Sequence, residues 1–312
     1  MRDESFTLAD GRTLAYTVLG ATNGPVAMHF HGAPTSRLDL AGWEEAFDSL
    51  GVTVVSPDRP GYGGSSPQPG RGLSDWPVDV AELADHLDLD RFAVIGTSTG
   101  GAYAAVCAAS LPDRVSSAGI VAGVTDMSWP HAWDGYYQSE ATVMRLGGES
   151  AATDWYVEHY GADGSGFFDE TGDLAPADAA MFEDQETAAG FLATMTEAFR
   201  QGVSALAQDV TIQGRGWSFD PAAISVPVAV LHGEADTLVP IAHGRHTAEV
   251  IPTATLSTFP AHGHLSIMNE IPRLAAQLAT PANSPNRPTA HAEPPEQQQP
   301  SAVAHTTESP PT

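Results

Sequence analysis

Residues 92–110 read FAVIGTSTGGAYAAVCAAS, and this stretch decides the fold. Its first four residues, all apolar, predict a buried β-strand, and its Ala-rich end predicts a helix. The turn between them, Gly-Thr-Ser-Thr-Gly, holds Ser98 in a strained conformation and leaves no room for side chains at Gly96 and Gly100. Because the following helix directs its N-terminal N–H groups toward Ser98, negative charge is favoured there. The stretch therefore predicts a nucleophilic serine.

The same alternation of strand and helix continues along the chain. The strand-like runs are almost wholly apolar, which is typical of a parallel sheet covered by helices on both faces. The predicted strands are 26–30, 52–56, 92–95, 115–121, 228–231 and 254–259, after a hairpin around Asp10-Gly11. The predicted helices are 40–50, 78–87, 100–110, 241–250 and 264–278. We therefore expect an α/β fold with a mostly parallel, doubly wound sheet.

The alternation stops at about residue 126 and resumes after residue 215. The intervening segment, 126–215, is rich in Trp, Tyr and Phe, and its stretches 139–147, 151–160 and 175–205 are typical of helices. We interpret it as a helical lid inserted into a core of residues 1–125 and 216–280. Most of its aromatic side chains are expected to fill the lid's own core, with one or two facing the substrate pocket.

The last segment, residues 281–312, has a different composition. It holds eight of the 24 prolines, three acidic residues and one arginine, and no aromatic residue. Such a segment buries too little apolar surface to offset the entropy lost on ordering. We predict that it is disordered and has no catalytic role, with a Pro-rich docking motif as the alternative.

Ser98 needs a general base, and that base needs an acid to orient it. Two later strands each end in a suitable group. Asp236 lies just beyond the strand 228–231, and His264 lies just beyond the strand 254–259. Because ligand sites form at the carboxyl ends of parallel strands, we predict that these three residues form a catalytic triad.

Each partner has a competitor in the sequence. Glu234 and Asp126 are the alternatives for the acid, and His262 is the alternative for the base. Glu234 is less favoured because it sits nearer the strand and is expected to face away. Asp236 is also favoured over Asp126, which follows the earlier strand 115–121. His264 is favoured over His262 because it stands closer to the start of the last helix.

A tetrahedral intermediate also needs two N–H groups aimed at its oxyanion. One is expected from Thr99, the residue after the nucleophile. The other is expected from Ala33, in the loop at the end of the strand 26–30. His31 in the same loop is interpreted as structural.

Five short motifs occur in order along the chain. They are His31-Gly32-Ala33-Pro34, 58–65 (DRPGYGGS), 96–101 (GTSTGG), Gly233-Glu234-Ala235-Asp236 and Gly263-His264. Together they resemble the α/β-hydrolase superfamily over residues 5–125 and 216–280. The resemblance implies that fold, a serine nucleophile and the order Ser98, Asp236, His264.

Comparison with individual branches of the superfamily argues against three of them. Haloalkane dehalogenases and epoxide hydrolases carry an aspartate at the nucleophile position, so Ser98 argues against both. Proline iminopeptidases usually carry tryptophan after the nucleophile and a second glycine in the first loop. Thr99 and Ala33 depart from that pattern, which argues against an aminopeptidase.

No metal or cofactor site is expected. Three pairs of histidines, His29 with His31, His243 with His246 and His262 with His264, lack the carboxylate neighbours and helical spacing of a metal site. Cys107 is the single cysteine and lies in an apolar helical stretch, where a buried structural thiol is expected.

The charge is strongly negative. The chain has 39 acidic residues and 13 basic ones, all arginine, which gives a formal net charge of −26. Such a field repels nucleic acids and anionic membranes, so neither is expected as a partner. Two explanations fit the absence of lysine, GC-rich coding and adaptation to high salt. Without a membrane-spanning run or a secretory pattern at the start, a cytoplasmic location is expected.

These features together predict an enzyme that acts on a small molecule. The expected reaction is hydrolysis of a small or medium, largely apolar ester through an acyl-enzyme. The alternatives that use the same triad are a cofactor-free haloperoxidase or perhydrolase, an acyltransferase, and less favoured a carbon–carbon bond hydrolase or aminopeptidase. A binding module without catalysis is the least favoured, and the oligomeric state stays open.

Overall fold

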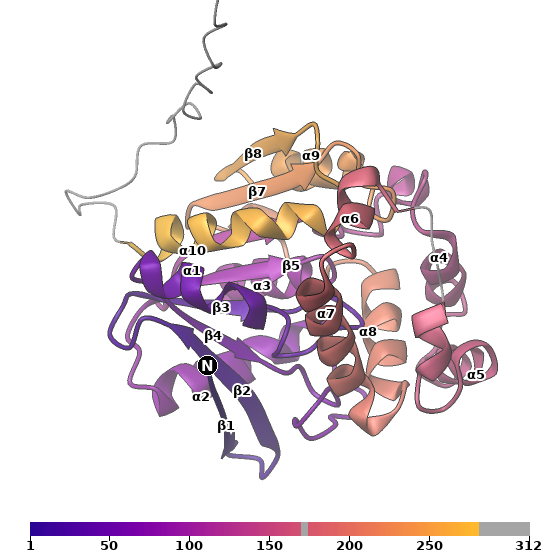
Figure 1. Cartoon of the computed structure of the whole chain (residues 1–312), viewed down its shortest axis with the longest axis horizontal. Coiled ribbons are helices and arrows are strands. Elements are labelled where there is room, and N and C mark those ends of the chain that lie inside the picture. The colour runs from indigo at the N-terminus through magenta and orange to yellow at the C-terminus, as the bar shows by residue number, and fades with distance from the viewer. Residues whose placement is uncertain (170–173, 281–312) are drawn as a thin grey trace, which may run out of the picture.

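The computed structural model describes residues 1–169 and 174–280 and is built around an eight-stranded sheet (Figure 1). The strand order is β1-β2-β4-β3-β5-β6-β7-β8. The strands are β1 (Arg2–Thr7), β2 (Thr13–Gly20), β3 (Val26–Phe30), β4 (Thr53–Pro57), β5 (Phe92–Thr97), β6 (Val115–Val121), β7 (Val228–Gly233) and β8 (Ala254–Phe259). β1, β2 and β4 pair antiparallel, and the pairs from β4 to β8 are parallel. The predicted mostly parallel sheet is confirmed, and the tail predicted to be disordered lies outside the described residues.

Helices cover both faces of the sheet, as the apolar strands require. α1 (Glu44–Ser49) and α10 (Ile271–Ala279) pack on one face, where Phe47 and Ile271 are buried against the strands. α2 (Trp76–His86), α3 (Gly100–Ser110) and α9 (Ile241–Val250) pack on the other. Cys107 is fully buried within α3, in line with a structural thiol.

In the described part of the chain between β6 and β7, five α-helices are inserted. They are α4 (Gln138–Met144), α5 (Glu149–Tyr160), α6 (Pro176–Met181), α7 (Gln185–Ala198) and α8 (Ser204–Gly214). The arrows of β5 and β7 point toward these helices, so the insertion lies at the carboxyl ends of the parallel strands (Figure 1). In the part of the chain that the structure describes, no helix combines the length and the apolarity needed to cross a membrane.

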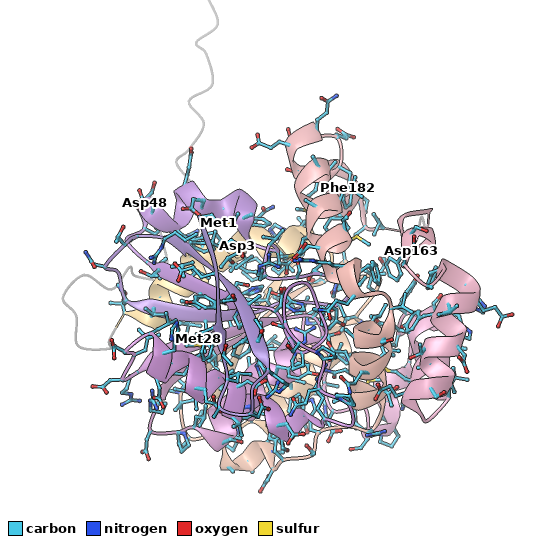
Figure 2. All side chains as sticks on the ribbon, turned by 90° about the horizontal axis from the view of Figure 1, so that it is seen from below. Met1, Asp3, Met28, Asp48, Asp163 and Phe182 are labelled. Carbon is cyan, nitrogen blue, oxygen red and sulfur yellow. The ribbon has the colours of Figure 1, made fainter. Side chains whose placement is uncertain are left out.

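The helix predicted over 175–205 is divided into α6, α7 and the start of α8. Asp184 begins α7, because its carboxylate accepts a hydrogen bond from the N–H of Thr187 at 2.8 Å. Gly202, with φ +85°, ends the short 3₁₀ turn that follows α7. Phe182 lies between α6 and α7, on the helical part that projects from the body in Figure 2.

Candidate active site

Ser98 stands at the tip of the turn between β5 and α3. Its φ of +53° is unusual for a residue with a side chain, and its N–H donates to the carbonyl oxygen of Val121 at 2.9 Å. A side chain at Gly96 would collide with the carbonyl oxygen of Gly100, and one at Gly100 would collide with that of Phe30. The two glycines are therefore required by the close approach of the backbone.

The three residues that the sequence singles out as serine, acid and base lie in contact. His264 Nε2 is 3.0 Å from Ser98 Oγ, and His264 Nδ1 is 2.8 Å from Asp236 Oδ2. The other carboxylate oxygen of Asp236 accepts the N–H groups of Leu238 at 2.9 Å and Val239 at 2.8 Å. Each of the three follows a parallel strand, so the topology of the sheet brings together groups far apart in sequence.

The charges around His264 favour its role as a proton acceptor. Burial alone would lower the pKa of His264, but the charge and hydrogen bond of Asp236, with smaller effects of Asp178 and Glu140, raise that pKa above its usual 6.5. Burial alone would raise the pKa of Asp236, but His264 and His232 hold that pKa below its usual range. Asp236 is therefore ionised wherever the protein is folded near neutral pH.

The competing residues lie elsewhere. Glu234 is exposed and accepts a hydrogen bond from the hydroxyl of Thr258 at 2.7 Å. Asp126 accepts the N–H groups of Ser128 at 2.9 Å and Trp217 at 3.0 Å, so it fixes a turn. The ring of His262 is partly buried and approaches Glu270 at 4.0 Å.

The loop after β3 approaches the serine turn. A Cβ placed on Gly32 would lie 3.4 Å from the Cβ of Ser98, so the two backbones are in contact distance. Within residues 1–169 and 174–280, the N–H groups of Ala33 and Thr99 donate to no protein acceptor. Both groups are thus available to a ligand oxygen beside Ser98.

The fully buried Arg59 holds the loop after β3 in place through hydrogen bonds to its carbonyl oxygens. It donates to the carbonyl oxygen of His31, and its Nη2 donates to that of Gly32 at 3.0 Å. Its Nε donates to Asp209, on α8, at 2.8 Å, and Asp209 also accepts a hydrogen bond from Arg71. An ion cluster at the base of the inserted helices thereby anchors the loop.

A cavity of about 460 Å³ opens above Ser98 and His264. Its walls are mostly apolar side chains from the inserted segment and from the loops after β7 and β8. These are Tyr137, Phe167, Leu174, Phe182, Phe191, Leu192, Met195, Leu238, Val239, Leu265 and Met268. A cavity of this size and character suits a small or medium apolar ligand.

Asp178, on α6, is a functional candidate that the sequence analysis missed. Its carboxylate is fully buried and accepts the N–H of His264 at 2.8 Å, the N–H of Ser266 at 2.8 Å and the hydroxyl of Ser266 at 2.6 Å. A side chain at Gly263 would collide with Asp178 and lie 2.6 Å from the Cβ of Ala175. Asp178 therefore fixes the backbone that carries His264.

Several of the other histidines are engaged in hydrogen bonds. His29 is fully buried between the hydroxyls of Ser56, at 3.2 Å, and Thr97, at 3.0 Å. Burial, with a smaller effect of the charge on Arg59, lowers the pKa of His29 to about 3, so its ring is neutral. Among the described residues, no group of three or more His, Cys, Asp or Glu side chains is arranged to hold a metal ion.

Comparison with known proteins agrees with this geometry. Residues 28–271 match the family described as alpha/beta hydrolase fold. A non-heme chloroperoxidase of Streptomyces lividans is 29% identical over 273 residues, which span 85% of this chain and 95% of that protein. A pimeloyl-[acyl-carrier protein] methyl ester esterase of Chromobacterium violaceum is 30% identical, over 72% of this chain and 83% of that protein. Among solved structures, a hydrolase from Pseudomonas aeruginosa PA01 matches with a TM-score of 0.67 and 23% identity, over 88% of this chain and 96% of that one.

Proposed function

The chain belongs to the alpha/beta hydrolase family, and on that premise we propose that it is a serine esterase acting on a small or medium, largely apolar ester. The observation that carries the proposal is the hydrogen-bonded line Ser98–His264–Asp236 at the floor of an apolar cavity. An alcohol becomes an effective nucleophile when an oriented base accepts its proton.

In the proposed reaction, Ser98 Oγ attacks the ester carbonyl carbon while His264 Nε2 accepts the hydroxyl proton. The N–H groups of Ala33 and Thr99 stabilise the oxyanion of the tetrahedral intermediate. His264 then gives its proton to the leaving alkoxide, which departs as the alcohol. A water that His264 deprotonates attacks the acyl-enzyme and releases the acid. Asp236 remains ionised and keeps the imidazole in the required tautomer.

We further propose that α4–α8 act as a lid that shapes the substrate site. The described lining of the cavity includes four aromatic residues of this segment, more than the one or two expected: Tyr137, Phe167, Phe182 and Phe191. Tyr136, Tyr156 and Phe199 are instead buried in the lid's own core. The lid thus offers a few aromatic side chains to the substrate and uses others for its stability.

The proposal predicts measurable turnover of simple activated esters. We expect hydrolysis of p-nitrophenyl esters with acyl chains of two to about eight carbons, with the longer chains declining once they exceed the cavity. A fluorophosphonate probe should label the wild-type protein and leave the Ser98→Ala protein unlabelled. If neither turnover nor labelling were seen with the folded protein, the proposed function would be wrong.

Perhydrolysis is a second candidate, because one relative is named a non-heme chloroperoxidase. It would use the same acyl-enzyme with hydrogen peroxide in place of water. Adding peroxide to the ester assay and measuring peracid separates the two. Peracid formation that exceeds acid formation would favour the second candidate over the esterase.

Loss of Asp178 should slow ester hydrolysis indirectly, through the position of His264. In Asp178→Ala we expect kcat/KM for a p-nitrophenyl ester to fall about 10²-fold, because His264 loses the carboxylate that fixes its backbone. The acid limb of the pH profile should also move to lower pH, since Asp178 helps to raise the pKa of His264.

Asp184→Ala is the matched control for this change. Asp184 lies in the same segment and caps α7, but its hydrogen bonds go to Thr187. We expect it to cost about 1 kcal/mol of stability and to leave the acid limb unchanged. An acid limb that stays in place in Asp178→Ala would count against the positioning role.

A further inference from the structure

The cavity above Ser98 has an unbalanced charge. Two carboxyl groups, those of Asp39 and Glu140, belong to its lining. No arginine is found in the described lining, and the chain contains no lysine. The carboxylate of Glu140 accepts a hydrogen bond from the hydroxyl of Tyr136, a residue of the lid core. Asp39, the other carboxyl group of the lining, lies on the loop after β3.

Three buried carboxylates of this protein are paired with arginine. Asp58 lies 2.8 Å from Arg37, Asp79 lies 2.5 Å from Arg12, and Asp209 lies 2.7 Å from Arg59. No such ion pair joins the partly buried Asp39 to any described residue, and its partners are the neutral Thr35 hydroxyl and the N–H of Gly32. Because a carboxylate that is withdrawn from water is stabilised by a counter-charge, the lack of a cationic partner at Asp39 points to a cationic ligand in the cavity.

The surroundings of Asp39 face the reacting serine. The loop after β3 carries Asp39 together with Gly32 and Thr35, and all three line the cavity beside Ser98. Thr35 is 8% exposed, and its buried hydroxyl interacts with the Asp39 carboxyl but meets no other polar partner among the described residues. The Thr35 hydroxyl and the Asp39 carboxyl therefore lie together in a cavity whose walls are mostly apolar.

The protonation of Asp39 supports a cationic ligand near neutral pH. Burial raises the pKa of Asp39 to about 7, although Thr35, the N–H of Gly32 and the charges of Arg59 and His264 each lower it. The carboxyl is therefore charged in a growing fraction of molecules as the pH rises through 7. A cation beside it would favour the charged form further.

We propose that Asp39 and Thr35 form a subsite for a protonated amine on the substrate, which makes an amine-bearing ester the preferred substrate class. The ammonium would donate hydrogen bonds to the Asp39 carboxylate and the Thr35 hydroxyl, while its hydrocarbon part contacts the apolar walls. This proposal deepens the proposed function and rests on it, because an amine-bearing ester is a substrate only if the protein is an esterase. Binding of the ammonium group in the cavity does not depend on catalysis.

The test measures binding without catalysis, in the full chain carrying Ser98→Ala. The probes are n-pentylammonium and 1-pentanol, which match in length and differ in charge. By calorimetry at pH 8 we expect the ammonium to bind about 10- to 100-fold more tightly than the alcohol. Adding Asp39→Asn should reduce this ratio to about one, because the amide keeps the shape and loses the charge.

Glu140→Gln is the matched control, since Glu140 is the other carboxyl of the lining. The ratio should persist in Glu140→Gln. Between pH 8 and pH 6 the ratio should fall in the parent protein as Asp39 is protonated. In Asp39→Asn any remaining change with pH belongs to His264, which also faces the cavity.

The outcomes separate the two proposals. An equal affinity for both probes in the parent protein, or a ratio abolished by Glu140→Gln and kept by Asp39→Asn, would overturn the subsite. If Asp39→Asn does not fold, Thr35→Val takes its place, and a severalfold loss of ammonium affinity with unchanged alcohol affinity is then required. Ammonium binding that depends on Asp39, in a protein whose wild type hydrolyses no ester, would leave the subsite standing and refute the esterase.

Discussion

Ser98→Ala should lower kcat for ester hydrolysis by about four to six orders of magnitude. The methyl group left at this position can neither attack a carbonyl nor form the acyl-enzyme. The fold should survive, because the turn depends on Gly96 and Gly100 and on the Ser98 backbone rather than on its hydroxyl. Steady-state kinetics and thermal unfolding of the same preparation provide the two measurements.

Two histidines give a sharper comparison. His264→Ala should lose a similar factor to Ser98→Ala, since the base 3.0 Å from Ser98 Oγ is removed. His262→Ala is the control, because that ring approaches Glu270 and is not in the described lining of the cavity. Equal losses in both histidine variants, or a Ser98→Ala protein as active as wild type, would refute the proposed mechanism.

Asp209→Ala should reduce the free energy of unfolding by about 3–5 kcal/mol. Asp209 is fully buried and is paired with two guanidiniums, those of Arg59 and Arg71. Removing it leaves two buried positive charges without a counter-ion, and Tyr103 loses the acceptor of its hydroxyl. Urea unfolding followed by circular dichroism measures the loss.

The exposed pair Asp85–Arg114 provides the control for this prediction. Its atoms are 2.8 Å apart, close to the 2.7 Å between Asp209 and Arg59, but its side chains are 68% and 30% exposed. Asp85→Ala should therefore cost less than about 1 kcal/mol. A similar small loss in both variants would show that burial of the Asp209 cluster contributes little.

Local sequence patterns were sufficient to predict the sheet and the contact among Ser98, Asp236 and His264. The strands predicted at 26–30 and 115–121 have those bounds in the structure, because buried parallel strands are mostly apolar runs. The strand 254–259 also has its predicted bounds, although its residues are exposed or only partly buried. Ser98 and His264 could be predicted to meet because both follow parallel strands, whose carboxyl ends share one edge. Their catalytic roles remain predictions until the variants are measured.

Contacts made across the insertion could not be predicted in the same way. Asp178 stands in an Ala-rich stretch and meets His264, 86 positions later, through packing of α6 that no local pattern encodes. Asp39 stands between two leucines, and its place in the cavity depends on the path of the loop after β3. The stretch 175–205 is helical as expected, but its division into α6, α7 and α8 was not predicted, because Asp184 and Gly202 were not recognised as a cap and a stop.

The attachments of the inserted helices bear on how this protein can be re-engineered. Exchanging residues 126–215 for the corresponding segment of a relative would remove Asp178 and Asp209 together. The remaining core would keep Gly263, which has no side chain because Asp178 and Ala175 approach it closely. It would also keep Arg59, whose charge would have lost its counter-ion. The segment is thus not a free-standing module, and a functional chimera has to transfer its anchoring residues along with its helices.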